Sequence, residues 1–485
     1  MNAAASHAPI SEVASENPWR EIIYQRFRGL PAPLLCFPDC IIPAASIWSG
    51  TRIWLNCLRE LGLRPGDRIA CALPAGPAFI EVLLASLWEG YTLALLPPGA
   101  VDEKTLSNLD ARLLIADHAD AGLRPDGDNL PVPRPRFATL RPVKSPPTPE
   151  IQLLARSSGT SGEGKWVALH TTSLFSVVRS HGPRLALTGA RVLSVLPWHH
   201  LFGLVIELLP ALFAGAEIIR AEKGGRDPGE VVALGRTHDI THFYAVPLTF
   251  TRLLATPGGS GFIRSLKGGI VGGAPINRDL AEALSGTRLR VGYGQTEAGP
   301  GIGLGEPGVF FAGCLGQPLG CETRIASDGV LEFRGPNSCL GIWEGGRIIP
   351  QLPGSWRRTN DIVENTPAGL RFLGRVDDRF KLGNGRMVSP AAIECALRSR
   401  APAGTEFWVF TRDGETVSVW HGGAQPAYEP TAAYLRESLG GLFPVLRDVQ
   451  AMPPSRFRHT PKGELNRRSM WAALGSEETG FRLAS

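Results

Sequence analysis

Residues 156–165 read RSSGTSGEGK and follow the apolar run at 151–155, which predicts a buried strand. Successive small residues allow backbone N–H groups to converge on one point, where they can bind an anion. Serine and threonine hydroxyls add donors, and Lys165 adds a positive charge, so the loop suits a chain of phosphates. Taken alone, such a loop is better explained as a flexible surface turn. It is not the G-x-x-x-x-G-K-[ST] pattern, because Trp166 follows Lys165.

Five later stretches combine glycines with polar residues suited to chemistry: LPWHHLFG at 196–203, GGAP at 272–275, VGYGQTEAG at 291–299, RTNDIV at 358–363 and GRVDDRFKLGNGRMVSPAAIE at 374–394. Together with the small-residue loop they resemble, in order, the motifs of the adenylate-forming superfamily. That family includes acyl- and aryl-CoA synthetases, nonribosomal adenylation domains and luciferases. The resemblance extends from about residue 40 to residue 470. It makes a phosphate-loop ATPase or kinase the weaker alternative.

The resemblance implies an ATP-dependent acid–thiol ligase. Such an enzyme activates a carboxylic acid as an acyl-adenylate and then transfers the acyl group to a phosphopantetheine thiol. The implied cofactors are ATP and Mg²⁺, and the implied thiol belongs to CoA or to an acyl carrier protein. Apolar residues near the expected acid pocket (Phe202, Phe243, Tyr244 and Val246) suit an aromatic or a medium-chain acid. The sequence does not choose between these acids or between these thiols.

The resemblance also assigns roles to individual residues. Glu297 supplies a hard oxygen for Mg²⁺, Thr296 contacts the α-phosphate, and His200 lies beside the acyl group and the thiol. Asp361 and Arg375 hold the ribose side of the nucleotide, and Gly383 lines the pantetheine tunnel. The phosphates and the adenine are assigned to Ser158, Gly159, Thr160, Ser161, Gly162, Lys165, Gly272, Gly273, Ala274, Tyr293 and Gly294.

Three positions depart from the family pattern. Asn360 stands where the family has a glycine before Asp361, and Gly164 stands where it has a proline before Lys165; the third departure removes a catalytic group. The family carries a catalytic lysine after the glycine of its last motif, whereas residues 460–468 read TPKGELNRR and place Glu464 there. A carboxylate cannot donate to two anions and repels both. Three explanations remain open: Lys462 acts instead, an arginine such as Arg467 substitutes, or adenylation is impaired. The last explanation makes a non-catalytic nucleotide-binding homologue the alternative function.

Alternation of apolar strands with helical segments between residues 46 and 271 predicts parallel sheets covered by helices. Shorter strands follow from about residue 309, and a small α+β unit begins near residue 375. We therefore expect an α/β fold with a large N-terminal domain of packed mixed and parallel sheets at 1–374. The family resemblance makes the α+β unit at 375–485 a mobile C-terminal domain with its hinge at Asp377. The Pro-rich segment 125–149 is expected to be an exposed connector.

Composition narrows the remaining classes. Charged residues make up 20% of the chain and hydrophobic residues 43%, which is ordinary for a globular protein. The net charge is only +5 and there is no long run of like charge, so nucleic acid is not favoured as a partner. The eight scattered cysteines indicate reduced thiols. No apolar stretch is long enough for a membrane span and no signal peptide is evident, so we expect a cytoplasmic protein.

Overall fold

The computed structural model describes residues 17–29, 35–37, 40–99, 101–117, 135–139, 143–157, 164–402, 404–423, 428–460 and 465–475. Strands β3 and β4 are buried along their whole lengths, as expected for short apolar runs in a parallel sheet covered on both faces. Helix α3 lies between them in sequence, begins with Pro77 in its first turn and ends at Gly90 in the left-handed conformation. The predicted strand–helix–strand unit is therefore present.

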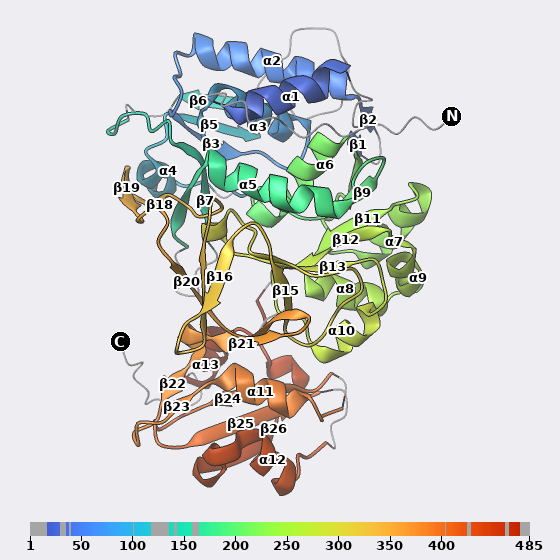
Figure 1. The fold of residues 1–485 in the computed structure, drawn as a ribbon, viewed down its shortest axis with the longest axis vertical. Helices are drawn as coiled ribbons and strands as arrows, with labels where there is room; N and C mark the ends of the chain where they lie inside the picture. Colours follow the sequence, from blue (N-terminus) through green and yellow to red (C-terminus); the bar gives the residue numbers. More distant parts are fainter. Residues whose placement is uncertain are drawn as a thin grey trace.

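The first sheet combines N-terminal strands with a later hairpin. Within the described residues, eight strands pair in the order β19-β18-β8-β7-β4-β3-β5-β6. Helices α1 (Pro18–Gly29), α2 (Ala44–Glu60), α3 (Pro77–Glu89) and α4 (Glu103–Leu109) accompany it (Figure 1). The strands are β3 (Arg68–Ala72), β4 (Thr92–Leu95), β5 (Leu113–Asp117), β6 (Pro135–Thr139), β7 (Ile151–Arg156), β8 (Trp166–His170), β18 (Gly341–Glu344) and β19 (Arg347–Pro350).

The second sheet has a parallel half and an antiparallel half. Its described strands follow the order β16-β17-β20-β21-β15-β14-β13-β12-β11-β9-β10-β1-β2. The pairings from β1 through β10, β9, β11 and β12 to β13 are parallel. The β1–β2 pairing and the pairings from β13 to β16 are antiparallel. Figure 1 shows helices α7 to α10 beside strands β11 to β13.

Both halves of the second sheet are built from short strands. The parallel half contains β1 (Leu35–Phe37), β9 (Arg191–Ser194), β10 (Glu217–Arg220), β11 (His242–Ala245), β12 (Gly268–Gly272) and β13 (Arg290–Tyr293), with β2 (Cys40–Ile42) at its edge. The antiparallel half contains β14 (Gly303–Leu304), β15 (Cys314–Pro318), β16 (Glu322–Ile325), β17 (Val330–Arg334), β20 (Arg357–Thr366) and β21 (Gly369–Arg375). The helices are α5 (Thr171–His181), η1 (Gly182–Leu185), the π-helix η2 (Phe202–Leu208), α6 (Leu209–Ala214), α7 (Pro228–Thr237), α8 (Pro247–Leu254), α9 (Gly259–Ser265), α10 (Arg278–Leu284) and η3 (Thr296–Ala298).

The C-terminal part has its own core. Its buried residues, among them Leu382, Val388, Leu397 and Val419, form a cluster with no members before residue 380. It begins below β21 in Figure 1. Its elements are η4 (Val376–Asp378), β22 (Phe380–Lys381), β23 (Met387–Val388), α11 (Pro390–Arg398), β24 (Glu406–Phe410), β25 (Val417–Gly422), α12 (Ala432–Leu439), η5 (Gly440–Val445), β26 (Leu446–Ala451), η6 (Pro454–Arg456) and α13 (Arg467–Gly475).

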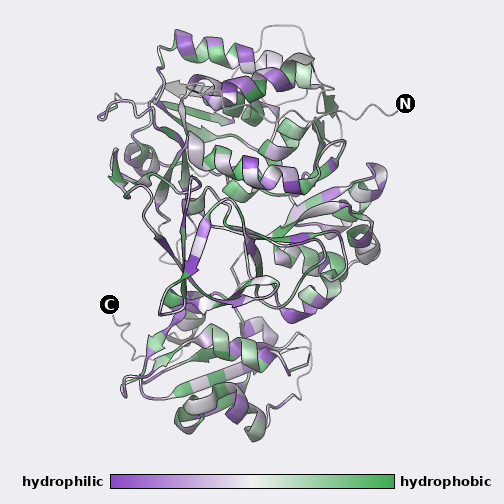
Figure 2. Ribbon diagram, viewed as in Figure 1, coloured by the Kyte–Doolittle hydropathy of each residue, from purple (hydrophilic) through white to green (hydrophobic). Residues whose placement is uncertain are grey.

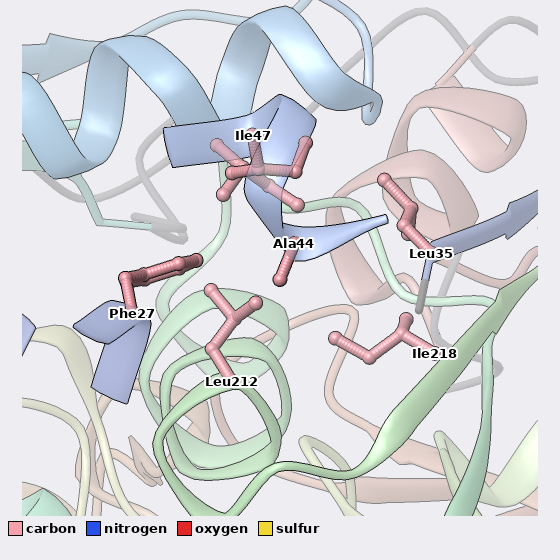
Figure 3. A pocket seen from close by; sticks show the side chains of 7 residues that line it. Phe27, Leu35, Ala44, Ile47, Leu212 and Ile218 are labelled. Atoms are coloured by element: carbon pink, nitrogen blue, oxygen red, sulfur yellow. The ribbon is translucent and has the colours of Figure 1, made fainter. Parts of the chain in front are cut away.

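Hydrophobic residues concentrate inside each unit, whereas the outer helices α1 and α2 alternate hydrophobic and hydrophilic residues (Figure 2). A small pocket lies within the N-terminal core, near α1, α2 and β10 (Figure 3). Its walls are entirely apolar: Phe27, Leu35, Ala44, Ile47, Ile80, Leu212 and Ile218. A dry apolar gap offers no group that could bind or activate a polar substrate. We therefore assign this pocket to core packing and place the functional site elsewhere.

The structure differs from the sequence expectation in one segment. The segment 125–149 is not wholly a connector, because β6 at 135–139 pairs antiparallel with β5 and extends the first sheet. Strand β21 ends at Arg375, which pairs with Asp361 on the neighbouring strand β20. All eight cysteines are free thiols. Across the described ranges, no helix combines the length and apolar character needed to cross a bilayer.

Candidate functional site

The carboxyl ends of the parallel strands β9, β11, β12 and β13 lie side by side, and such an edge is where open α/β sheets usually bind ligands. Gly272 ends β12 and Gly273 follows it with φ of +83°, a conformation that favours glycine. A Cβ atom on Gly272 would lie 3.4 Å from Phe202 Cζ, and one on Gly273 would lie 3.5 Å from Val246 Cγ1. The expected adenine-side loop therefore borders the start of the π-helix η2.

Tyr293, Asp361 and Arg375 meet although they lie far apart in the sequence. The Tyr293 hydroxyl donates to Asp361 Oδ2 over 2.6 Å, and Arg375 Nε forms an ion pair with Asp361 Oδ1 at 3.1 Å. Burial, together with the neighbouring Asp361 carboxylate, raises the pKa of Tyr293 well above its usual value. The phenol therefore stays a hydrogen-bond donor at physiological pH. Three residues that the sequence assigned to one nucleotide thus form one contact group.

The turn after Tyr293 brings Thr296 and Glu297 close to the same group. Gly294 has no room for a side chain, because a Cβ atom there would lie 1.4 Å from Pro300 O. Thr296 and Glu297 start η3 and are half-buried. The Glu297 carbonyl accepts from the backbone N–H of Cys339 over 2.9 Å, which ties the turn to the segment leading into β18.

An arginine near Glu297 did not emerge from sequence reasoning. Arg357 begins β20 and donates through Nη2 to the Cys339 carbonyl over 2.6 Å. Burial lowers the pKa of the Arg357 guanidinium. The nearby Cys339 and Glu297 act in the opposite direction and raise this pKa, but burial is the larger effect. A cation therefore lies near Glu297 at the proposed phosphate side of the site. The only sequence signal was its position directly before the RTNDIV stretch.

The turn that contains Glu297 offers one carboxylate to a magnesium ion. Mg²⁺ is usually held by one or two carboxylates together with substrate phosphates and water, and not by an all-protein cage. Glu297 fits that pattern, and no cluster of three metal-ligating side chains occurs among the residues that the structure describes. Glu297 would hold the ion, which would neutralise charge on the phosphates.

The base of the small-residue loop is described, whereas Ser158, Gly159, Thr160, Ser161 and Gly162 lie outside the described residues. Ser157 N donates to Lys165 O over 2.8 Å, and this bond closes the loop where β7 and β8 begin to pair. A Cβ atom on Gly164 would lie 2.2 Å from Ser157 O, so the glycine found in place of the family proline avoids a clash. Lys165 is exposed at this base.

Strand β8 connects the loop to the Glu297 turn. Leu340 N donates to Ala168 O over 2.8 Å, and Cys339, the residue before it, donates to Glu297 O. Lys165 precedes Ala168 by three residues in the same extended segment, along which the chain advances by about 3.3 Å per residue. The loop base and the Glu297 turn are therefore connected through β8 and residues 339–340.

The two histidines of LPWHHLFG lie at different depths. His200 is exposed, His199 is half-buried, and their ring centroids are 4.5 Å apart. Burial, helped by the nearby His200 and Arg220, lowers the pKa of His199 to about 4. His199 is therefore neutral at physiological pH, whereas the ring of His200 is exposed.

The hinge region contacts both parts of the chain. Asn360 Nδ2 donates to Asp377 Oδ2 over 3.0 Å, and Asp378 Oδ1 lies 3.4 Å from Arg467 Nε. Gly383 lies within the C-terminal part, where its N–H donates to Gly414 O over 2.7 Å. Arg278, at the start of α10, donates to the carbonyl of Ser399 in the C-terminal part.

The last motif is only partly described, because Lys462 and Glu464 lie outside the described residues. Arg467 is described and forms two bonds to Glu394, of 2.9 and 2.7 Å, while its side chain is largely buried. A guanidinium held in this way supports the C-terminal fold. Arg467 is therefore a poor substitute for the family lysine.

Two of the aromatic residues expected near the acid pocket, Phe243 and Tyr244, belong to different cores. Its ring packs against Phe250 and Phe262 in the core on the α7–α9 side of the sheet. Tyr244 faces the opposite side and belongs to the core that includes Leu204 and the π-helix. Phe243 and Tyr244 therefore lie on opposite faces of the sheet, because successive residues of a strand point to opposite faces.

Comparisons with known proteins agree with this geometry. The family model for the AMP-binding enzyme matches residues 56–341, more than half of the chain. A feruloyl-CoA synthase from an Amycolatopsis species is 27% identical over 453 residues, which cover 85% of this chain and 91% of that protein. An anthranilate–CoA ligase from Pseudomonas aeruginosa is 26% identical over 386 residues, covering 71% and 73%.

A solved structure shows the same fold. The amide bond synthetase McbA from Marinactinospora thermotolerans superimposes with a TM-score of 0.74 at 19% identity, covering 94% of this chain and all of that chain. The adenylate-forming resemblance and the α/β fold class are thereby confirmed. The chain belongs to the AMP-binding enzyme family of the adenylate-forming superfamily and is an AMP-forming acid–thiol ligase.

Proposed function

We propose that this ligase uses ATP to activate an aromatic carboxylic acid and then passes the acyl group to the thiol of CoA. The observation that carries the proposal is the contact group of Tyr293, Asp361 and Arg375 beside the Glu297 turn. An aromatic face, a carboxylate that accepts hydroxyl protons and a guanidinium suit the adenosine part of a nucleotide. Two relatives named for aromatic acids, the feruloyl-CoA synthase and the anthranilate–CoA ligase, match 85% and 71% of this chain. A long-chain-fatty-acid–CoA ligase matches only 52% of it, so the comparison favours an aryl substrate over a fatty acid.

The first half-reaction needs positioning and charge neutralisation more than covalent chemistry by the protein. A carboxylate oxygen of the acid attacks the α-phosphorus of ATP, the bond to the bridging oxygen breaks, and pyrophosphate leaves. In this proposal Lys165 and the loop amides hold the phosphates, Thr296 contacts the α-phosphate, and Glu297 holds the magnesium ion. Gly272, Gly273, Ala274 and Gly294 border the adenine.

The second half-reaction exchanges AMP for a thiol. The sulfur attacks the carbonyl carbon of the acyl-adenylate, AMP leaves, and a thioester forms. We assign His200 to the acyl and thiol side of the site, and Gly383 to the passage taken by the pantetheine arm. Residues 375–485 would rotate about Asp377 between the two steps, since rotation about a short segment changes few dihedral angles. The phosphopantetheine of a carrier protein is the alternative thiol.

A panel of acids tests the proposal. Ferulate, anthranilate, benzoate, cinnamate and octanoate are each supplied with ATP and Mg²⁺, and hydroxylamine traps any acyl-adenylate. We expect acid-dependent pyrophosphate release with at least one aromatic acid, and a thioester of that acid when CoA is added. ATP binding without pyrophosphate release for any acid would instead favour a nucleotide-binding homologue. Transfer to a phosphopantetheinylated carrier protein but not to CoA would identify the other thiol.

A further inference from the structure

Three neighbouring strands place polar side chains in one row near their carboxyl ends. Ser194 of β9 has its Cα opposite Arg220 of β10 on one side and opposite Tyr244 of β11 on the other. Residues two positions apart on a strand share a face. Val192 and Ile218, two residues before Ser194 and Arg220, belong to the core that contains the π-helix η2. The row therefore faces that helix.

Glu207 of the π-helix completes the cluster. The Ser194 hydroxyl donates to Glu207 Oε1 and accepts from Trp198 Nε1 over 3.1 Å and from Arg220 Nη1 over 2.9 Å. One carboxylate oxygen of Glu207 is thus connected to the network. The carboxyl group is 1% exposed, so burial raises its pKa to about 8.

Two polar atoms of this cluster have no partner. Glu207 Oε2 and the Tyr244 hydroxyl are buried, and neither has a hydrogen bond to any described residue. Tyr244 is fully buried, and its pKa is raised by burial and then by the nearby Glu207. A buried polar atom without a hydrogen-bond partner destabilises the fold, so two such atoms in one cluster point to a bound group that completes their hydrogen bonds.

The pair lies below the glycine edge of the site. Val246 is two residues beyond Tyr244, and Gly272 is two residues beyond Ile270, which is the Cα partner of Tyr244. Phe202 and Val246 lie close to Gly272 and Gly273. The residues next to the polar pair, toward the carboxyl ends of the strands, are therefore apolar side chains on one side and glycines on the other. A ring bound against these apolar residues would have a polar substituent directed toward the pair.

We propose that Glu207 Oε2 and the Tyr244 hydroxyl form the polar end of the acid pocket and bind a hydroxyl group on the ring of an aromatic acid. A hydroxyl both donates and accepts, so it can bridge two protein groups that each need a partner. An unsubstituted ring or an alkyl chain leaves both atoms unpaired and is disfavoured. This inference rests on the proposed function and narrows its substrate class to hydroxyaryl acids.

The test measures binding and does not require turnover. The probes are sulfamoyladenosine conjugates of benzoic and cinnamic acids and of their 2-, 3- and 4-hydroxy derivatives, with dissociation constants measured by calorimetry. We expect at least one hydroxylated probe to bind about tenfold or more tightly than its unsubstituted partner. That ratio should fall to within about twofold of one in Tyr244→Phe and should also fall in Glu207→Gln.

Tyr91→Phe is the matched control. Tyr91 is equally buried and its hydroxyl also lacks a partner, but it lies between α3 and β4 and away from the glycine edge. The same atom is removed, so the binding ratio of the wild-type protein should persist. If Tyr244→Phe fails to fold, Glu207→Gln provides the comparison.

Two results would overturn the inference in distinguishable ways. If all probes bind with equal affinity, the ligase proposal stands and the hydroxyl subsite is wrong. The subsite is also wrong if Tyr244→Phe and Glu207→Gln change only the melting temperature, which would indicate a buried structural water. If no probe binds, the proposed function fails together with the subsite.

Discussion

The side-chain amide of Asn360 donates to the Asp377 carboxylate over 3.0 Å and so connects the strand of Asp361 to the expected hinge. The next residue, Asp378, forms an ion pair with Arg467 of α13 in the C-terminal part. Two consecutive acids are therefore bound in opposite directions, one toward β20 and one toward the C-terminal core. Asn360 replaces the glycine that the family carries there, so the first of these contacts needs the side chain that this chain has gained.

Loss of the Asn360 contact should change the balance between the two half-reactions. A hydrogen bond of this kind contributes about 0.5–1.5 kcal/mol, so Asn360→Ala should shift the ratio of adenylation to thiol-transfer rates about twofold to tenfold. The two rates should move in opposite directions, because the bond favours one orientation of the C-terminal part. Single-turnover measurements of each step check this. The control Asn56→Ala, on the exposed side of α2, should leave the ratio unchanged. The prediction would be contradicted if Asn360→Ala changed the adenylation rate and the thiol-transfer rate by the same factor.

Removal of the Tyr293 hydroxyl should weaken nucleotide binding. Tyr293→Phe keeps the aromatic face but deletes the donor to Asp361 Oδ2. Hydrogen bonds to charged groups contribute about 1.5–3 kcal/mol, so the KM for ATP should rise at least about tenfold. The KM for the acid should change less. The control Tyr91→Phe removes a buried hydroxyl elsewhere and should leave the KM for ATP unchanged. An unchanged KM for ATP in Tyr293→Phe would show that the hydrogen bond from Tyr293 to Asp361 does not contribute to nucleotide binding.

Restoring the family lysine at position 464 should accelerate adenylation. Removing one preorganised hydrogen-bond donor near a developing charge commonly lowers the rate by a factor of about 10²–10³. Glu464→Lys should therefore raise the rate of acid-dependent pyrophosphate release by a factor within that range. If Lys462 already supplies the charge, Lys462→Ala should reduce the rate of the native protein. An unchanged rate in Lys462→Ala would eliminate that explanation. Glu60→Lys makes the same charge change at the exposed end of α2 and should leave the rate unaltered.

Glu207 should make stability fall between about pH 6.5 and pH 8. Burial raises the pKa of Glu207 from 4.5 to about 8, so in this range the folded protein holds a proton that the unfolded chain has lost. Unfolding then releases a proton, and the free energy of unfolding declines by about 1.4 kcal/mol per pH unit. Urea unfolding at pH 6.5 and pH 8 should show this decline in the wild-type protein and a smaller one in Glu207→Gln. Equal declines would refute the assignment.

Below pH 6.5 buried histidines should oppose this effect, because burial lowers the pKa of each; the largest shifts are at His181 and His199. Burial lowers the pKa values of His181 and His199 from 6.5 to about 4, so here the unfolded chain binds protons that the folded protein does not. Their contribution to stability is therefore present above pH 6.5 and is lost as the pH falls toward 4. The stability maximum is expected near pH 6.5. A maximum above pH 8 would contradict these assignments.

Much of the site could be predicted from the sequence because its motifs are local. Gly294 can be recognised beside Tyr293, and Gly273 within GGAP, since a tight turn or close backbone approach restricts the residue type at that position. Strand and helix positions in the N-terminal half followed from apolar runs and turn residues. The strand at 135–139 was missed because its flanks are rich in proline and charge, and its pairing with β5 is a tertiary contact.

The sequence by itself determined the family, the order of the motifs and the replacement of a family lysine by Glu464, since each depends only on residue type and spacing. Only the tertiary structure decided which side chains meet: Tyr293 with Asp361, Asn360 with Asp377, and Glu207 with Ser194 near Tyr244. It also decided that Phe243 and Tyr244 belong to cores on opposite faces of the sheet. The physical reason is that hydrogen bonds and burial depend on strand register and helix packing, which bring together residues that are distant in the chain.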